Sequence, residues 1–193
     1  KALVGETDPT KRKELEAQIA SLDNKQLALK ILLNSLFGAM ANTYFRFFDF
    51  RCAEGITSTG RYFIQKVGQM ASSYIDKMSG STDSLVYIDT DSNYFSLRSL
   101  IKRAGLDNLP TPKLVDALDK ICEKKFGKRI NEACNLIGDE LNVFDNQLAV
   151  KREKICESAL WVAKKRYALY VWDDEGVRYN EAKISVTGLE VKR

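Results

Sequence analysis

The sequence of 193 residues contains no histidine, and this absence removes several classes of active site. Catalytic triads of the Ser-His-Asp kind and Cys-His pairs need an imidazole, and many zinc sites use it as a ligand. The four cysteines form no C-x-x-C pair, which also argues against zinc: Cys52, Cys122, Cys134 and Cys156. A metal in this chain would therefore take oxygen ligands, a set that favours Mg²⁺, Mn²⁺ or Ca²⁺.

Long apolar runs are absent too. No run approaches the roughly 20 residues that cross a bilayer. The opening stretch KALVGETDPTKRKELE has no apolar region of the signal-peptide kind. These features and the scattered cysteines predict a soluble intracellular protein with no membrane partner. The net charge of +4 permits nucleic-acid binding without requiring it.

What the chain does contain is helical periodicity over its first part. Two helices are predicted within residues 9–38, because Asp8 is a good N-cap, Pro9 suits the first helical position, and SLDN at 21–24 is typical of a boundary. Leucines at helical spacing indicate a stripe of core residues: Leu29, Leu32, Leu33 and Leu36.

Short helices and strands are predicted over the rest of the chain. The expected elements are an irregular aromatic segment at 44–58, a helix at 59–78, a hairpin of LVYI and NYFSL, a loop at 98–112, a helix at 113–137 and strands beyond 141 with a turn at 173–176. Because helices and antiparallel strands are segregated in this order, the fold class predicted is α+β.

The hairpin encloses an acidic corner, YIDTDS at 87–92, with two carboxylates one residue apart. An Asp-x-Asp turn without function is a common explanation for such a pair. A calcium loop of the EF-hand type is excluded, since Tyr94 takes the position of its glycine and Leu100 that of its glutamate. The third interpretation is a metal site for phosphoryl transfer, in which Asp89 and Asp91 point to one face.

Four motifs, in order, resemble those of family B (α-like) DNA polymerases. K-x-x-x-N-S-x-x-G at 30–38 resembles motif B, and YIDTDS resembles motif C. KKRY at 164–167 and TGLE at 187–190 resemble two elements further along the family's chain. Within this family, the sequence resembles the replicative polymerases of T-even-type bacteriophages. This resemblance implies the cytoplasm of a phage-infected bacterial cell as the location.

The resemblance implies a fold and a domain organisation. Residues 1–38 would be the C-terminal part of the helical fingers, and residues 39–193 would be the palm, an antiparallel sheet with flanking helices. The implied reaction is DNA-templated transfer of a nucleotide from a dNTP to a primer 3′-OH, with two Mg²⁺ or Mn²⁺ ions. The implied partners are primer-template DNA, dNTP and a sliding clamp.

Roles for single residues follow from the same resemblance. Asp91 would be a metal ligand, and Asp89 would support the metal site, with its direct ligation left open. Lys30 would contact the triphosphate. Asn34, Phe37 and Gly38 would line the nucleotide pocket, and the primer-template would be held by the KKRY residues Lys164, Lys165, Arg166 and Tyr167.

The sequence departs from the family pattern in two residues and one motif. Phe37 stands where tyrosine is usual, and Ile88 stands where glycine is usual, which fits an ordinary strand. Motif A, D-x-x-S-L-Y-P-S, with its metal-binding aspartate, is not in this sequence. We therefore expect the chain alone to be inactive and to need segments that supply motif A, the exonuclease and the thumb.

Two alternatives to a catalytic role stay open. The chain could be a non-catalytic DNA-binding module derived from a polymerase palm, or a structural module that contacts other replication proteins. Reverse transcriptases and RNA polymerases also pair aspartates in a palm, but they usually place them adjacent, and here Thr90 separates Asp89 from Asp91.

Overall fold

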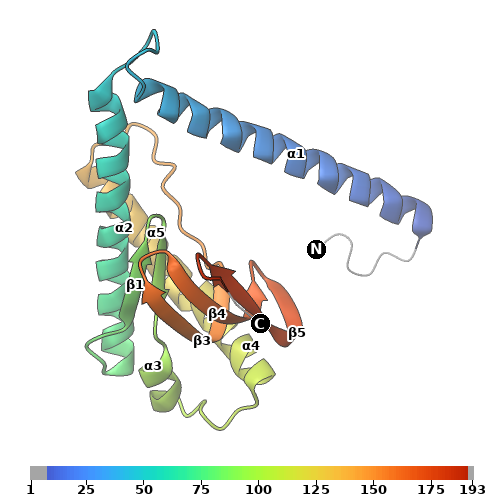
Figure 1. The fold of residues 1–193 in the computed structure, drawn as a ribbon. Helices are drawn as coiled ribbons and strands as arrows, with labels where there is room; N and C mark the ends of the chain where they lie inside the picture. Colours follow the sequence, from blue (N-terminus) through green and yellow to red (C-terminus); the bar gives the residue numbers. More distant parts are fainter. Residues whose placement is uncertain (1–7, 191–193) are drawn as a thin grey trace. The chain divides into compact units, whose positions relative to one another are not determined.

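A computed structural model describes residues 8–190 (Figure 1). The first seven residues of the predicted fingers segment and the last three of the predicted palm lie outside this range. The chain divides into two compact units, Lys1–Thr59 and Gly60–Arg193.

The first unit is built around one long helix, α1, Pro9–Met40. The predicted cap is confirmed, because the Asp8 carboxylate accepts a hydrogen bond from the Thr10 backbone N–H at 2.9 Å and Pro9 opens the helix. The predicted boundary at 21–24 is wrong. Ser, Leu, Asp and Asn each cost no more than about 0.7 kcal/mol relative to alanine in a helix, and no Gly or Pro interrupts the segment.

The leucine stripe of α1 has the predicted helical spacing but not the predicted burial. Its four leucines are between 50% and 66% exposed, and no described residue of α1 is buried. A spacing of three and four residues identifies one face of a helix, whereas burial needs a second element packed on that face. Within its own unit the described residues supply none, so the predicted core stripe is wrong.

Helix α2, Phe50–Ser79, begins earlier than the predicted helix at 59–78. The Asp49 carboxylate accepts a hydrogen bond from the backbone N–H of Arg51 at 2.9 Å and satisfies a donor at the helix start. The irregular stretch is therefore shorter than the expected 44–58. The helix ends as predicted before Gly80, which has φ +71°.

Three further helices lie in the described part of the second unit, which runs to residue 190. Helix α3, Arg98–Arg103, lies where a loop was predicted. The predicted helix at 113–137 is present as α4, Thr111–Ile121, a π-helical turn, Cys122–Phe126, and α5, Gly127–Glu140. Their buried side chains join α2 in two clusters, Val67 with Cys134 and Ile137, and Ile75 with Leu100 and Phe126. A third cluster packs Val115 and Leu118 of α4 against Ile155.

Two antiparallel sheets complete the second unit, and the predicted α+β class is confirmed. Strands β1, Leu85–Asp89, and β2, Ser92–Phe95, form the predicted hairpin. Strands β3, Lys154–Ala163, β4, Arg166–Asp174, and β5, Val177–Thr187, form a sheet in that order. The predicted turn between β4 and β5 is also confirmed, with Glu175 at φ +50° and Gly176 at φ +85°.

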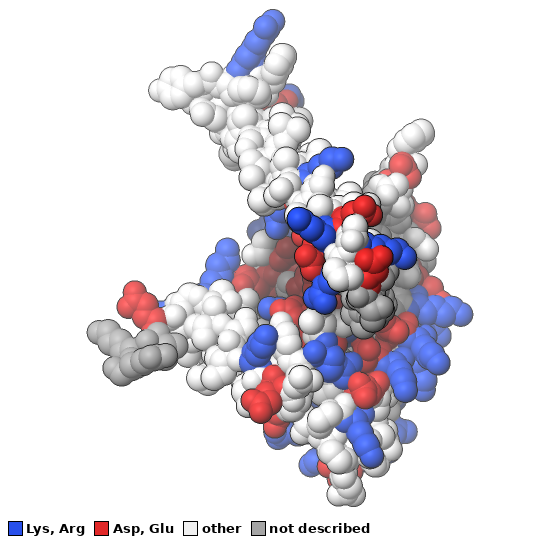
Figure 2. All heavy atoms as spheres, turned by 90° about the vertical axis from the view of Figure 1, so that its right-hand side faces the viewer, with Lys and Arg blue, Asp and Glu red and all other residues white. Residues whose placement is uncertain are grey.

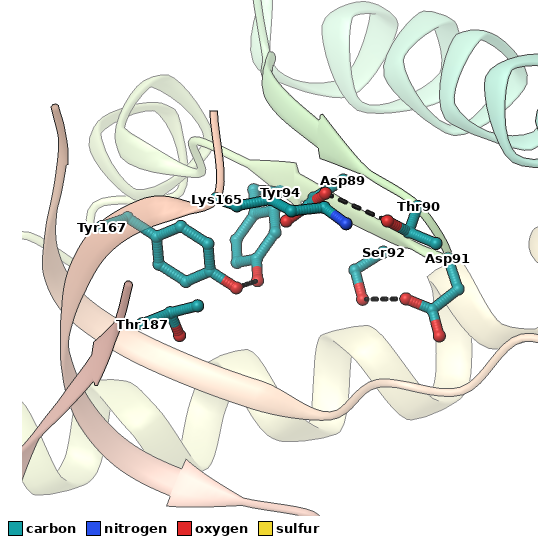
Figure 3. Close-up of a pocket in the computed structure, with 8 residues that line it drawn as sticks. All are labelled: Asp89, Thr90, Asp91, Ser92, Tyr94, Lys165, Tyr167 and Thr187. Atoms are coloured by element: carbon teal, nitrogen blue, oxygen red, sulfur yellow. Dashed lines mark hydrogen bonds between the residues drawn. The ribbon is translucent and has the colours of Figure 1, made fainter. Parts of the chain in front are cut away.

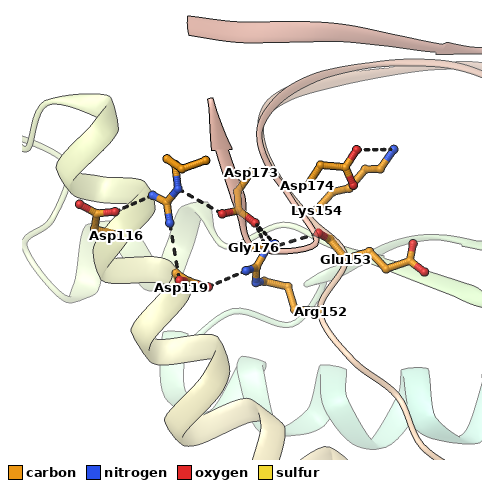
Figure 4. A network of polar contacts seen from close by, with 9 residues as sticks. Asp116, Asp119, Arg152, Glu153, Lys154, Asp173, Asp174 and Gly176 are labelled. Carbon is orange, nitrogen blue, oxygen red and sulfur yellow. Dashed lines mark hydrogen bonds and ion pairs between the residues drawn. The ribbon is translucent and has the colours of Figure 1, made fainter. Parts of the chain in front are cut away.

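Ion pairs link α4 to the β4–β5 hairpin (Figure 4). Asp173, only 1% exposed, binds the guanidinium groups of Arg152 and Arg178. Arg152 also pairs with Asp119 at 2.7 Å, and Arg178 pairs with Asp116 at 2.6 Å. Two carboxylates of α4 are thereby tied to the sheet through two arginines.

The surface carries charge of both signs. Figure 2 shows Lys and Arg side chains interspersed with Asp and Glu on the face drawn. Among residues 8–190, no helix is both long enough and apolar enough to cross a membrane.

Candidate active site

The acidic corner is the turn of the β1–β2 hairpin. Asp89 pairs with Ser92, so Thr90 and Asp91 form a two-residue connection. Thr90 has φ +50°, which is uncommon for a β-branched residue and stores backbone strain at the corner. The Thr90 hydroxyl donates to Asp89 Oδ1 at 3.1 Å, and the Ser92 hydroxyl donates to Asp91 Oδ1 at 3.4 Å. Each carboxylate therefore keeps its second oxygen outside these local bonds.

The KKRY motif forms a second tight turn, between β3 and β4. Ala163 pairs with Arg166, which leaves Lys164 and Lys165 as the two connecting residues. Lys165 has φ +59°, and its backbone N–H donates to the Tyr87 hydroxyl at 3.0 Å. A side chain at Gly188 would overlap the Lys165 carbonyl oxygen, so glycine is required for this close approach.

An aromatic cluster joins the two hairpins. Tyr87 faces Tyr94 across the first hairpin, and Trp161 faces Tyr167 across the second. Ring centroids of Tyr87 and Tyr94 lie between 5.7 and 6.0 Å from those of Trp161 and Tyr167. Such tilted and edge-to-face contacts add to the apolar area buried between the hairpins. The cluster therefore sets the position of one turn relative to the other.

A pocket of about 330 Å³ opens where the turns meet (Figure 3). Figure 3 shows the Lys165 side chain extending towards the acidic turn and Tyr167 lying beside Tyr94. The lining joins the motif C, KKRY and TGLE segments: Asp89, Thr90, Asp91, Ser92, Tyr94, Lys165, Tyr167 and Thr187. Three motifs from distant parts of the second unit thus contribute to one pocket.

The polar chemistry of the pocket combines carboxylates, an amine and phenols. Burial, first, and then the hydrogen bond that Tyr94 donates to Tyr167 at 3.1 Å raise the pKa of Tyr94 above its ordinary value. Tyr94 therefore stays protonated and a donor at neutral pH. Asp89 is half-buried and Asp91 is exposed, so the carboxylates lie at the mouth of the pocket.

The residues present fit part of a magnesium site. Mg²⁺ is typically held by one or two carboxylates, with waters and substrate phosphates completing its shell. Asp89 and Asp91 supply two carboxylates on one turn. Over residues 8–190, no cluster of three or more acidic or cysteine side chains has the geometry to hold a metal ion.

The predicted site residues fall into two groups. Asp89, Asp91, Lys165 and Tyr167 line the pocket, whereas Lys164 and Arg166 flank Lys165 as exposed residues outside the lining. The predicted nucleotide-binding residues all lie on α1, in the first unit: Lys30, Asn34 and Gly38 are exposed, and Phe37 is half-buried. Ile88 lies in β1 opposite Asn93, as expected for an ordinary strand residue.

Sequence reasoning missed the residues that hold the pocket together. Tyr94 and Thr187 line it, and Tyr87 and Gly188 contact the backbone of Lys165. The alternation of side chains between the two faces of a strand could have identified both tyrosines. Tyr87 lies two residues before Asp89 and Tyr94 two residues after Ser92, so each tyrosine shares a sheet face with a polar residue at the turn.

Comparison with known proteins agrees with the motifs. The family model described as DNA polymerase family B matches residues 8–106. A DNA-directed DNA polymerase of Escherichia phage RB69 is 34% identical over 87% of this chain, and one of Enterobacteria phage T4 is 33% identical over 93%. The DNA polymerase delta catalytic subunit of Schizosaccharomyces pombe is 32% identical over 86% of this chain.

The matched region is a small part of each relative. The chain spans 20% of the RB69 protein, 21% of the T4 protein and 13% of the yeast subunit. The family match nevertheless takes in about half of this chain and includes motifs B and C. The chain belongs to DNA polymerase family B and is similar to the polymerases of the T-even phages.

Proposed function

We propose that this chain supplies the palm and the C-terminal part of the fingers of a DNA-templated DNA polymerase. Residues 1–38 would belong to the fingers and residues 39–193 to the palm. In the reaction, the primer 3′-oxygen bonds to the α-phosphorus of a dNTP, pyrophosphate leaves, and the hydroxyl proton passes to solvent. The observation that supports this function best is the pocket in which Asp89 and Asp91 meet Lys165 and Tyr167.

The charges of the pocket support a role for a divalent cation. Its lining holds two carboxylates and one amine, so at neutral pH the lining alone carries a net negative charge. DNA and dNTP are anions, and such a lining by itself repels both. Asp89 and Asp91 would hold Mg²⁺ or Mn²⁺, and two such ions supply charge neutralisation at the attacking and leaving oxygens when bound.

The remaining residues would bind and orient the substrates. Lys165 would donate to the primer-template near its growing end, and Tyr167 would add a planar surface and a hydroxyl. Lys164 and Arg166, exposed beside the turn, would contact backbone phosphates. On α1, Lys30 would bind the triphosphate, while Asn34, Phe37 and Gly38 would line the site of the nascent base pair.

The 193 residues by themselves would not catalyse synthesis. Motif A, which carries another metal-binding aspartate in the family, is not among them. Segments supplying motif A, the exonuclease and the thumb would be needed, and a sliding clamp would be a further partner. The phage relatives support the cytoplasm of an infected bacterial cell as the place of action.

A chimera tests the catalytic part of this proposal. Residues 1–193 would replace the aligned segment of the phage T4 relative, and primer extension with Mg²⁺ would be measured for the chimera and for its Asp91→Asn variant. We expect extension to fall by about 10²-fold or more in the variant, because Asp91 would no longer help to hold the cation whose positive charge stabilises the reacting phosphates. Equal extension by both proteins would refute a catalytic role for Asp91.

Direct binding assays separate this function from a DNA-binding module without catalysis. The 193-residue chain would be titrated with fluorescent primer-template, and Mn²⁺ binding would be followed by electron paramagnetic resonance. We expect Lys165→Ala to weaken DNA binding and Asp91→Asn to weaken Mn²⁺ binding. If Asp91→Asn changes neither Mn²⁺ binding nor DNA synthesis by the chimera, while Lys165→Ala still weakens DNA binding, the module is the better description.

A further inference from the structure

Tyr94 lines the pocket but lies outside the four motifs, so the roles proposed for the motif residues do not account for it. It lies in β2, half-buried beneath the acidic turn, and its ring packs on Trp161 and Tyr167 with centroid distances of 5.7 and 5.8 Å. Its hydroxyl donates to the hydroxyl oxygen of Tyr167 at 3.1 Å. Packing alone needs the ring and leaves the hydroxyl without a purpose.

The direction of this hydrogen bond matters for Tyr167. A phenol has one hydrogen to donate and lone pairs to accept. Because Tyr94 donates, the oxygen of Tyr167 is the acceptor, and the hydrogen of Tyr167 is not used in the contact. Hydrogen bonds in such a chain polarise one another, so a phenol that accepts a bond becomes a better donor.

The surroundings keep Tyr94 in its donating form. Burial and the contact with Tyr167 raise the pKa of Tyr94, so its proton stays on the oxygen throughout the neutral range. The position of the ring is fixed from the other side, because Tyr87 pairs with Tyr94 across the hairpin and also accepts the backbone N–H of Lys165. These contacts fix the position of the Tyr94 ring beside Tyr167.

We propose that Tyr94 is a positioning residue for DNA: it fixes the hydroxyl of Tyr167 so that the Tyr167 hydrogen is presented to a phosphodiester oxygen of the primer strand. This inference rests on the proposed function, because it takes the pocket to be a DNA site. It adds a residue in the strand that follows motif C to the contacts made by the KKRY turn.

A double-mutant cycle on DNA binding tests the role. The variants are Tyr94→Phe, Tyr167→Phe and the two combined, each of which keeps the aromatic ring. Affinity for a fluorescent primer-template would be measured by anisotropy at one fixed salt concentration, since the phosphate contribution depends on salt. Tyr62→Phe is the matched control, because it also removes a hydrogen-bonded hydroxyl, donated to Glu140 at 2.6 Å, but lies outside the pocket lining.

We expect Tyr167→Phe to weaken DNA binding by about 10- to 100-fold, the range for one hydrogen bond to a charged group such as a phosphodiester. Tyr94→Phe should weaken it by a smaller factor, and the double variant should bind like Tyr167→Phe alone, because Tyr94 acts only through Tyr167. Tyr62→Phe should leave the affinity unchanged even where its thermal stability falls as much as that of Tyr94→Phe.

Two results would overturn the inference and leave the proposed function standing. One is unchanged DNA affinity in Tyr94→Phe while Lys165→Ala and Tyr167→Phe both weaken binding, which would make Tyr94 a packing residue only. The other is an additive double variant, which would show two independent contacts. If Lys165→Ala and Tyr167→Phe also leave the affinity unchanged, the pocket is not a DNA site, and the proposed function fails together with the inference.

Discussion

The buried carboxylate of Asp173 is where a change of a few atoms should destabilise this chain most. It is 1% exposed and accepts hydrogen bonds from Arg152, from Arg178 Nε at 3.1 Å and from the backbone N–H of Gly176 at 3.0 Å. Asp173→Asn keeps the shape of the side chain, removes its charge and turns an amide group towards cationic donors (Figure 4).

The expected loss follows from the partners left behind. Removing one member of a buried ion pair costs roughly 3–5 kcal/mol, because the other charge stays buried. Arg152 and Arg178 keep Asp119 and Asp116 as partners, so we expect a value near the lower end. A loss of about 3 kcal/mol lowers the melting temperature of a chain of this size by roughly 10 °C.

The loss should also depend on pH in one direction. Burial alone would raise the pKa of Asp173, but the hydrogen bonds from Arg152, Gly176 and Arg178 outweigh it and lower the pKa below 3.8. A lowered pKa means that the carboxylate stabilises the fold at pH values above 3.8 and that this contribution is lost as the pH falls through the folded-state value. The difference in stability between wild type and Asp173→Asn should therefore be constant near neutrality and shrink below about pH 4.

Urea unfolding followed by tryptophan fluorescence measures the loss in free energy of unfolding and the dependence of that loss on pH. The matched control is the neighbouring Asp174→Asn, whose carboxylate is 34% exposed and lies 3.5 Å from Lys154 Nζ. A surface pair of this kind contributes about 0–1 kcal/mol. If Asp173→Asn is no more destabilising at pH 7 than Asp174→Asn, or if its effect does not shrink at low pH, the buried charge is not what holds α4 to the sheet.

Two further predictions concern glycines at close approaches. Gly188→Ala should cost at least about 1–2 kcal/mol, because Gly188 has φ +61° and the added methyl overlaps the Lys165 carbonyl. The same variant should weaken DNA binding by moving the lysine turn, and unchanged urea unfolding and anisotropy would contradict this. Gly68→Ala places a methyl 2.7 Å from Asn93 Oδ1 and should cost about 1–3 kcal/mol. Gly60→Ala, on the same helix with open space around it, should instead stabilise by up to about 1 kcal/mol in urea unfolding, and equal effects at the two positions would refute the steric argument.

The elements that the sequence predicted well are those whose signals are local. The Asp8 cap, the hairpin around the acidic corner and the turn after Asp173 each depend on a few neighbouring residues, and all three are present. The failures involve partners distant in sequence. Leu29 and its neighbours on α1 have helical spacing, but no sequence pattern says which element covers them. The short helix α3 was missed because six residues give too little periodicity to separate a helix from a loop.

For the candidate site, too, the local motifs were predicted and the contact between distant residues was not. This difference indicates which substitutions would disturb the site. Motif spacing gave Asp89, Asp91, Lys165 and Tyr167, because each motif is a local turn. The contact that brings the turns together, from the Lys165 N–H to the Tyr87 hydroxyl, joins residues 78 apart in the chain. Neither motif specifies that contact, since the orientation of one hairpin on the other depends on aromatic packing between them. A substitution that leaves every motif intact but removes a ring between the hairpins should therefore disturb the carboxylates and the lysine together.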